Sequence, residues 1–166
     1  MSNGLTQVCT AALLAFSLIA SSATPGAAEG PASVVSASGV IATKSAYGMD
    51  ETVDRLKKDI AAKGITFFQQ IDQAALAGKA GIELRPSILL VFGNPPLGTQ
   101  FITANPQAGL DWPVRLLVYR DDKGAVWTAY TDFAWIAKRH GVASRDAQFH
   151  MATEVAASIV SSVSAR

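Results

Sequence analysis

The sequence predicts an α+β fold: a single layered domain whose mixed or antiparallel sheet packs with helices and includes a hairpin in its C-terminal half. Segments with apolar residues at helical spacing alternate with short β-branched strands. Residues 114–120 and 125–131 flank the turn Asp121-Asp122-Lys123-Gly124, which is the spacing of a hairpin. A hairpin mixed with helices favours an α+β sheet over a doubly wound parallel one.

The composition suits one globular domain. The chain has 166 residues, of which 49% are apolar and 16% charged. About 100–200 residues is the usual size of a domain. We expect a signal peptide over 1–28, a short polar linker over 29–33 and a single α+β domain over 34–166.

The domain is expected to begin with a strand and a helix. Residues 34–43 are rich in β-branched and small residues, which is typical of a strand. Asp50 is placed to cap a helix in which Glu51 and Arg55 pair four residues apart. Gly64 then stands where a helix ends in the left-handed conformation.

Two further strands follow. Residues 65–71 predict a strand with three apolar side chains on one face, namely Ile65, Phe67 and Ile71. Asp72 can cap a short helical turn that Gly78 closes. The strand over 87–92 contains ILLVF, which is apolar on both faces. Such a strand is covered on both sides or lies at a subunit contact.

Helices are expected on either side of the hairpin. Asn94 precedes a proline and so favours extended backbone before a helix over 97–104. Asp132 can cap a helix that ends at Gly141, and Ser144 can cap the last helix. That last helix is expected to bury five apolar side chains: Phe149, Ala152, Ala156, Ile159 and Val163.

The N-terminus predicts export to the periplasm or the medium. Val8–Ala20 is an apolar run too short to cross a bilayer comfortably, which needs about 20 residues. Small residues follow it, so we expect cleavage after Ala28, with Ala23 as the alternative. The only cysteine, Cys9, lies in this segment, so the mature chain is expected to be free of cysteine.

Charge excludes nucleic acid as a partner. The formal net charge is +1, with acids and bases interspersed. Nucleic-acid binding usually needs a clustered basic face, and the sequence has none. We also expect no membrane span once the signal peptide is removed.

The stretch from about 50 to 140 resembles the Domain of Unknown Function 302 family. The resemblance rests on ordered segments: TVDRLKKDIAAKGI, QQIDQAAL, the apolar strand that runs into FGNP, and WPVRLLVYRDDKGAVWTAYTD with the helix after it. It implies a compact α+β domain. It carries over no catalytic residue and no cofactor.

Four residues are candidate ligand contacts because they stand at the ends of strands or helices. They are Asn94, Tyr130, Asp132 and His140. Rigid turns at strand ends can frame a pocket. His140 also has a simpler explanation, because a cation at the end of a helix complements the helix dipole. His140 and His150 have no metal-ligand spacing, so we expect no metal site. No GxSxG, GxGxxG or P-loop motif is present, so we expect no catalytic residue and no cofactor.

The leading hypothesis is therefore a non-enzymatic domain that binds an unknown small molecule or protein. The first alternative is an enzyme whose site is assembled by folding, with His140 or His150 as base. The second alternative is haem or metal binding through histidine. A homodimer is also expected, because the ILLVF strand and the aromatic residues need covering.

Overall fold

The structure is a computed structural model, and it describes residues 33–165. Its sheet has six strands in the order β1-β2-β6-β5-β4-β3, and every neighbouring pair is antiparallel. The strands are β1 (Ser33–Val35), β2 (Val40–Lys44), β3 (Thr66–Asp72), β4 (Ser87–Gly93), β5 (Val114–Arg120) and β6 (Val126–Thr131). The helices are α1 (Met49–Ala62), α2 (Gln73–Lys79), α3 (Pro95–Ala104), the 3-10 helix η1 (Pro106–Leu110), α4 (Phe133–Arg139) and α5 (Asp146–Ser161).

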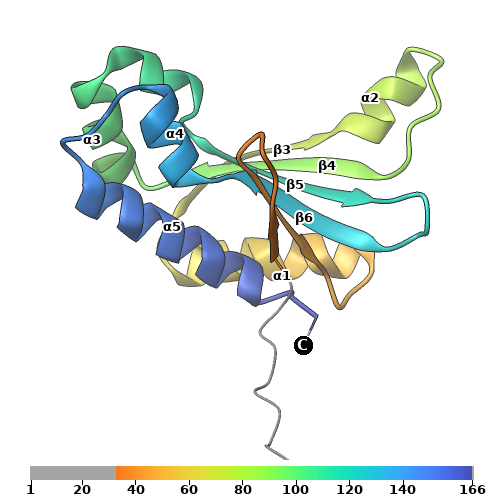
Figure 1. Ribbon diagram of the computed structural model, residues 1–166. Coiled ribbons are helices and arrows are strands. Elements are labelled where there is room, and N and C mark those ends of the chain that lie inside the picture. The colour runs from red at the N-terminus through yellow and green to blue at the C-terminus, as the bar shows by residue number, and fades with distance from the viewer. Residues whose placement is uncertain (1–32, 166) are drawn as a thin grey trace, which may run out of the picture.

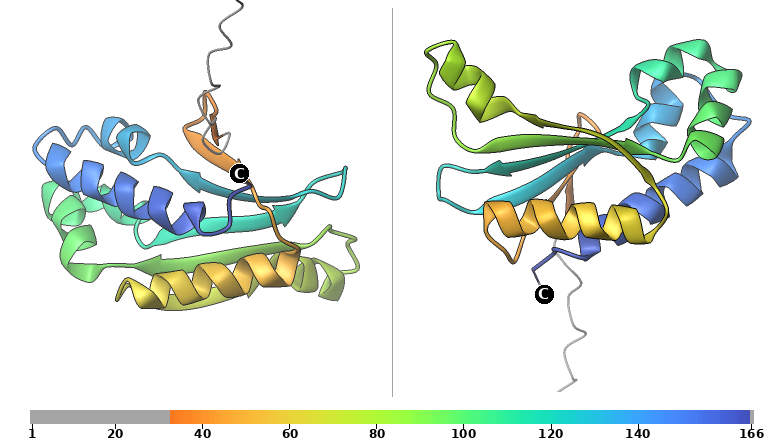
Figure 2. Two further views of the ribbon diagram at one scale, coloured as in Figure 1. Left: turned by 90° about the horizontal axis from the view of Figure 1, so that it is seen from below. Right: turned by 180° about the vertical axis from the view of Figure 1, so that it is seen from behind.

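The fold is α+β with one core, as the sequence predicts. Helices α1 and α5 lie side by side across one face of the sheet (Figures 1 and 2). The strands turn alternate side chains toward these helices, and the register aligns Leu90 with Leu116 and Val118 with Thr128. All four side chains are almost fully buried. All five side chains expected to be buried by the last helix are buried, although Val163 lies just beyond its end.

The remaining elements lie at the two ends of the sheet. Helices α3, η1 and α4 form a lobe at one end, and α2 projects from the other (Figure 1). We call the segment 73–86, which contains α2, the arm. None of the helices between Ser33 and Ala165 is long and apolar enough to cross a bilayer.

The first predicted strand, 34–43, is wrong as a single element. It is a hairpin of β1 and β2 around a tight turn. Gly39 adopts φ 75°, and the Ser36 carbonyl accepts a hydrogen bond of 2.9 Å from its amide. The turn residues Ser36 to Gly39 carry little side-chain bulk, so the chain can reverse there.

The predicted facing of the strand over 65–71 is also wrong. A bulge between Phe67 and Gln69 inserts one residue. Phe67 therefore pairs with Phe92 on the helix side, whereas Ile71 pairs with Leu89 on the opposite side. One inserted residue moves every later side chain to the other face.

Several helix ends differ from the prediction. Gly48, not Asp50, is the N-cap of α1, and Asp50 lies in the first turn. Arg145, not Ser144, precedes α5, and its side chain makes no capping bond. Helix α2 continues through Gly78 to Lys79. Both unpredicted N-caps lack a side-chain capping bond, and packing decides where these two amphipathic helices begin.

Two helix caps, one ion pair and the C-terminal hairpin are confirmed. The Asp72 carboxylate accepts from the amide of Ala75, and the Asp132 carboxylate accepts from the amide of Ala134. The Arg55 guanidinium donates to the Glu51 carboxylate at 2.8 Å. The hairpin of β5 and β6 is present as predicted.

Candidate functional site

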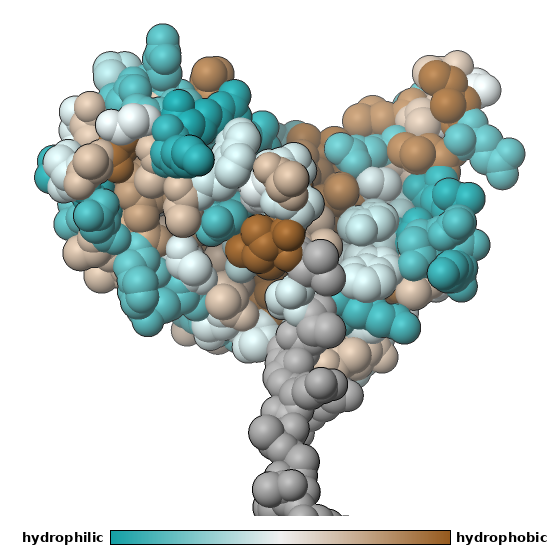
Figure 3. Space-filling view, viewed as in Figure 1, coloured by the Kyte–Doolittle hydropathy of each residue, from teal (hydrophilic) through white to brown (hydrophobic). Residues whose placement is uncertain are grey.

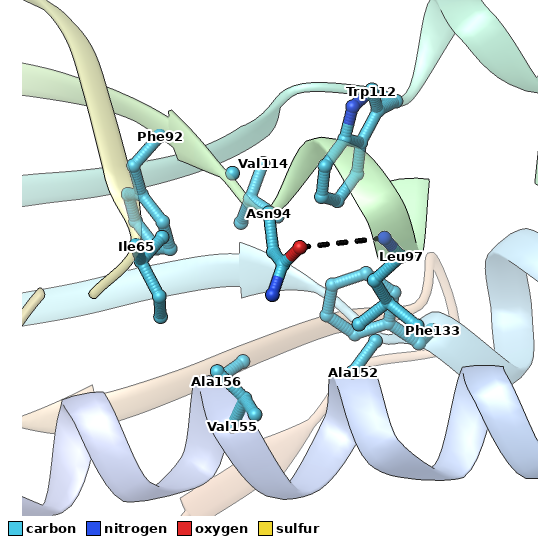
Figure 4. Close-up of a pocket in the computed structure, with 11 residues that line it drawn as sticks. Ile65, Phe92, Asn94, Leu97, Trp112, Val114, Phe133, Ala152, Val155 and Ala156 are labelled. Atoms are coloured by element: carbon cyan, nitrogen blue, oxygen red, sulfur yellow. Dashed lines mark hydrogen bonds between the residues drawn. The ribbon is translucent and has the colours of Figure 1, made fainter. Parts of the chain in front are cut away.

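The four candidate residues lie near the lobe end of the sheet, and two of them cap helices. The Asn94 side chain accepts a hydrogen bond of 3.4 Å from the amide of Leu97 and so caps α3, as Figure 4 shows. Asp132 caps α4. Burial raises the pKa of the Tyr130 phenol above its usual 10.0, and the Asp132 carboxylate adds to that rise.

The enclosed cavity beside Asn94 is too small for a ligand, although an open groove of about 410 Å³ between Asn94 and Met151 borders it. The volume of the enclosed cavity is about 20 Å³, close to that of one water molecule, and its walls are mostly apolar (Figure 4). Trp112 and Phe133 contribute to it, but Tyr130, Asp132 and His140 do not. The structure therefore does not bring the four candidates together around this space.

His140 belongs to a cluster that the sequence did not reveal. Its Nε2 lies 2.6 Å from Oδ2 of Asp111, and both side chains are about 5% exposed or less. Asp111 also accepts hydrogen bonds from Arg139 at 3.2 Å and from Arg115 at 3.1 Å. One buried carboxylate thus receives donors from β5 and from the end of α4.

The Asp111 cluster joins the parts of the lobe. Asp111 follows η1, while Arg139 and His140 end α4. The Asn105 amide also donates to the His140 carbonyl at 2.8 Å. The space beside Asp111 is only about 10 Å³, which leaves no room for a substrate. The arrangement supports a structural tie, because charge-assisted bonds to a shielded carboxylate are among the stronger ones in proteins.

His150 lies on the solvated side of α5, as expected. Its Nδ1 is 3.6 Å from the Glu154 carboxylate, and both side chains are more than 60% exposed. Within residues 33–165, no three His, Cys, Asp or Glu side chains meet in a way that could hold a metal ion.

A second region stands out on the face of the sheet opposite α1 and α5. We call it the open face, because no helix of the described residues lies across its middle (Figures 1 and 2). An apolar row crosses five neighbouring strands there: Ile71, Leu89, Leu117, Ala129 and Ala42. Tyr119 and Trp127 lie beside each other in the next row.

The side chains of the open face are less buried than their neighbours on the helix side. Leu89, Leu117, Tyr119 and Trp127 are all partly exposed. The Trp127 indole donates a hydrogen bond of 2.8 Å to Asp121, and this bond lowers the pKa of that carboxyl below its usual 3.8. The open face is therefore an ordered surface that carries aromatic and aliphatic groups.

The arm borders the open face and is apolar as well. Three of its side chains are about half exposed or more, namely Leu76, Ile82 and Leu84. No residue of α2 is buried. A groove of about 690 Å³ separates the arm from β5, and Leu84, Leu117 and Tyr119 line it together with Glu83, Arg85 and Arg120. Figure 3 shows the apolar surface along the notch on the inner side of the arm.

Sequence reasoning found only part of these two regions. It singled out ILLVF and the aromatic residues of the hairpin as needing cover. Leu89 and Trp127 lie at the open face, whereas Leu90 and Tyr130 are buried on the helix side. Sequence reasoning missed Asp111, because a single acid 29 residues from its histidine has no local signature. It also missed the apolar arm, because the sequence there predicts only a short helical turn and not its exposure.

Comparison with known proteins identifies the family. The family model "Domain of unknown function DUF302" matches residues 41–165, which extends the resemblance beyond 50–140 at both ends. A crystal structure of an uncharacterized conserved DUF302 protein from Bacillus stearothermophilus superposes with a TM-score of 0.69 at 17% identity. That match covers 75% of this chain and 98% of the other, and it supports the fold.

Curated relatives are also similar over part of their length. A protein of Brucella suis biovar 1, named fluoride-specific ion channel FluC 1, is 36% identical over 105 residues. Proteins with similar names from Brucella abortus and Brucella melitensis match equally well. The match covers 63% of this chain, and the chain spans about two fifths of the length of these relatives, 41% in the first case.

Proposed function

The chain belongs to the DUF302 family, and we propose that it is a non-enzymatic binding protein that holds a protein partner on its open face. The observation that carries this proposal is the apolar row from Ile71 to Ala42, flanked by aromatic residues and by an apolar arm. Large contiguous apolar surfaces are rare on isolated domains and mark interaction sites.

Size favours a macromolecular partner over a small molecule. The enclosed cavities beside Asn94 and Asp111 hold about 20 and 10 Å³, whereas the open grooves beside the arm and beside Met151 hold about 690 and 410 Å³. Small-molecule sites usually measure about 300–1,000 Å³ and enclose most of the ligand. Both grooves have that volume, but each is open to solvent along one side, which suits an extended or helical protein surface.

The enzymatic alternative has one supporting contact. His140 lies within hydrogen-bond distance of a carboxylate, which a general base could use. However, Asp111 also binds two arginines, and no space for a substrate lies beside it. The cluster is better explained as a tie within the lobe.

We propose, as part of this function, that the protein works in the periplasm or outside the cell. Support comes from the apolar run Val8–Ala20 and the small residues that follow it. The signal peptide and most of the linker lie outside the described residues. N-terminal sequencing of protein from expressing cells should begin at Glu29 or Thr24, and a sequence that begins at Met1 would contradict export.

Native mass spectrometry of the same protein tests the binding function. We expect a complex heavier than one chain, and we expect Leu117→Asp to abolish it by placing a charge on the open face. Met151→Asp is the matched control, because Met151 is 52% exposed but lies on α5, across the sheet from the open face. A single bare chain, or a complex that survives Leu117→Asp, would refute the proposal.

A further inference from the structure

The arm and the open face are two apolar surfaces of the same chain that do not pack against each other. Helix α2 has seven residues and buries none of them. A helix this short has little stability of its own and depends on packing. The Ser87 hydroxyl donates to Gln73 at 2.7 Å and anchors the base of the arm, yet Leu76, Ile82 and Leu84 remain largely exposed.

Area shows that the sheet alone is too small to form a stable interface. The five strands that the apolar row crosses, at about 4.8 Å spacing and about 20 Å length, present about 480 Å² in projection. A stable interface needs roughly 800 Å² on each partner. The arm borders the same face and supplies the additional apolar surface. An occupant must therefore contact both.

Charge around the groove is of mixed sign. Glu83 lies on the arm side, while Arg85 and Arg120 line the same groove. A surface that pairs with itself about a two-fold axis needs both signs, so that an acid of one copy meets a base of the other. A rim of one sign would repel its own copy.

We infer that the partner on the open face is a second copy of this chain, related by a two-fold axis, with each arm lying on the sheet of the other copy. This inference rests on the proposed function, which makes the open face a binding surface. In such a dimer, Leu76, Ile82 and Leu84 of one copy cover the row that contains Leu89 and Leu117 of the other. Both unpartnered surfaces are then buried in one symmetric contact.

Charge variants test the dimer by its symmetry. Glu83→Arg leaves only positive charge in the groove, and the double variant Arg85→Glu, Arg120→Glu leaves only negative charge. Each variant alone should raise the dissociation constant by about tenfold or more, because like charges then face each other. An equimolar mixture should recover dimers that contain one copy of each. Sedimentation equilibrium measures all three, and failure of the mixture to recover would contradict the two-fold arrangement.

A photo-crosslinking residue at position 117 of the full chain separates the inference from the proposed function. A product of twice the chain mass, with the cross-link in the arm of the second copy, is the expected result. A product with a different protein would overturn the inference and leave the proposed function standing. A cross-link within one chain to residues 1–32, or no cross-link at all, would overturn both. The same crosslinker at Met151 is the control for random collision.

Discussion

The two faces of this sheet are made by the same strands, yet they differ in how completely they are covered. On the helix side, Leu116 and Val118 are almost fully buried beneath α1 and α5. Leu117 and Tyr119, the alternate residues of the same strand, are partly exposed. The sequence of the strand does not distinguish the covered face from the open one, because both faces are apolar. What distinguishes them is whether a helix crosses the face.

The largest difference between the faces should appear when adjacent leucines are truncated. Leu116→Ala should lower the free energy of unfolding by about 2–5 kcal/mol, since it leaves a cavity in the core. Leu117→Ala should cost less than about 1 kcal/mol in dilute solution, because surface truncations are usually mild.

Urea unfolding of the two variants at several protein concentrations measures both values. If the open face binds a second copy, the cost of Leu117→Ala should grow with protein concentration, whereas that of Leu116→Ala changes little. Equal costs for the two variants at all concentrations would remove the distinction between the faces.

A glycine in the lobe should give the next largest effect. A Cβ at Gly98 would overlap the indole of Trp112, which packs edge-on against Phe101. Gly98→Ala should therefore destabilise the protein by about 1–3 kcal/mol through overpacking. Gly109→Ala is the control, because its Cβ would meet Ile102 at 3.9 Å, an ordinary contact. Thermal unfolding should separate the two variants by several degrees.

Disruption of the Asp111 cluster should lower the free energy of unfolding by less, because the side chains of Arg115 and Arg139 are about half exposed and can be hydrated when the carboxylate is lost. Asp111→Asn should cost about 1–2 kcal/mol by weakening charge-assisted hydrogen bonds. Hydrogen exchange should show faster opening at α4 than at α1 if the cluster ties the lobe to the sheet. Equal acceleration in both helices would argue that the lobe is not a separate unit.

The smallest effect should be the pH dependence that Asp121 adds. Its folded pKa lies below 3.8 because the Trp127 indole donates to the carboxylate. A depressed pKa adds stability that is present above about pH 4 and is lost as the pH falls through the folded value. Asp121→Asn should remove that part of the acid sensitivity, while Asp122→Asn serves as the control in the same turn. Acid titrations that superpose for wild type and Asp121→Asn would contradict this.

The fold was predicted well wherever a helix or turn is defined by residues close together in the sequence. The helix that ends at Gly64, the caps at Asp72 and Asp132, and the hairpin turn are all confirmed, since each depends on residues close in the chain. The bulge at Phe67 was missed, because an inserted residue changes no composition and is stabilised by the neighbouring strand.

The candidate sites were harder to predict because they depend on distant contacts. Asp111 meets His140 only after β5, β6 and α4 have folded between them. The open face exists because the helices pack on the other side of the sheet, and the sequence of a strand does not show on which side a helix will pack. The four residues predicted at the ends of strands and helices lie in one region, but they do not line one common cavity.

The bulge in β3 also bears on how the molecule can assemble. β3 is the outermost strand on its side of the sheet, and a bulge spoils the regular backbone ladder that an added strand would need. Addition of a further strand is therefore hindered at the β3 border, whereas the two-fold contact inferred above would be complete with two copies.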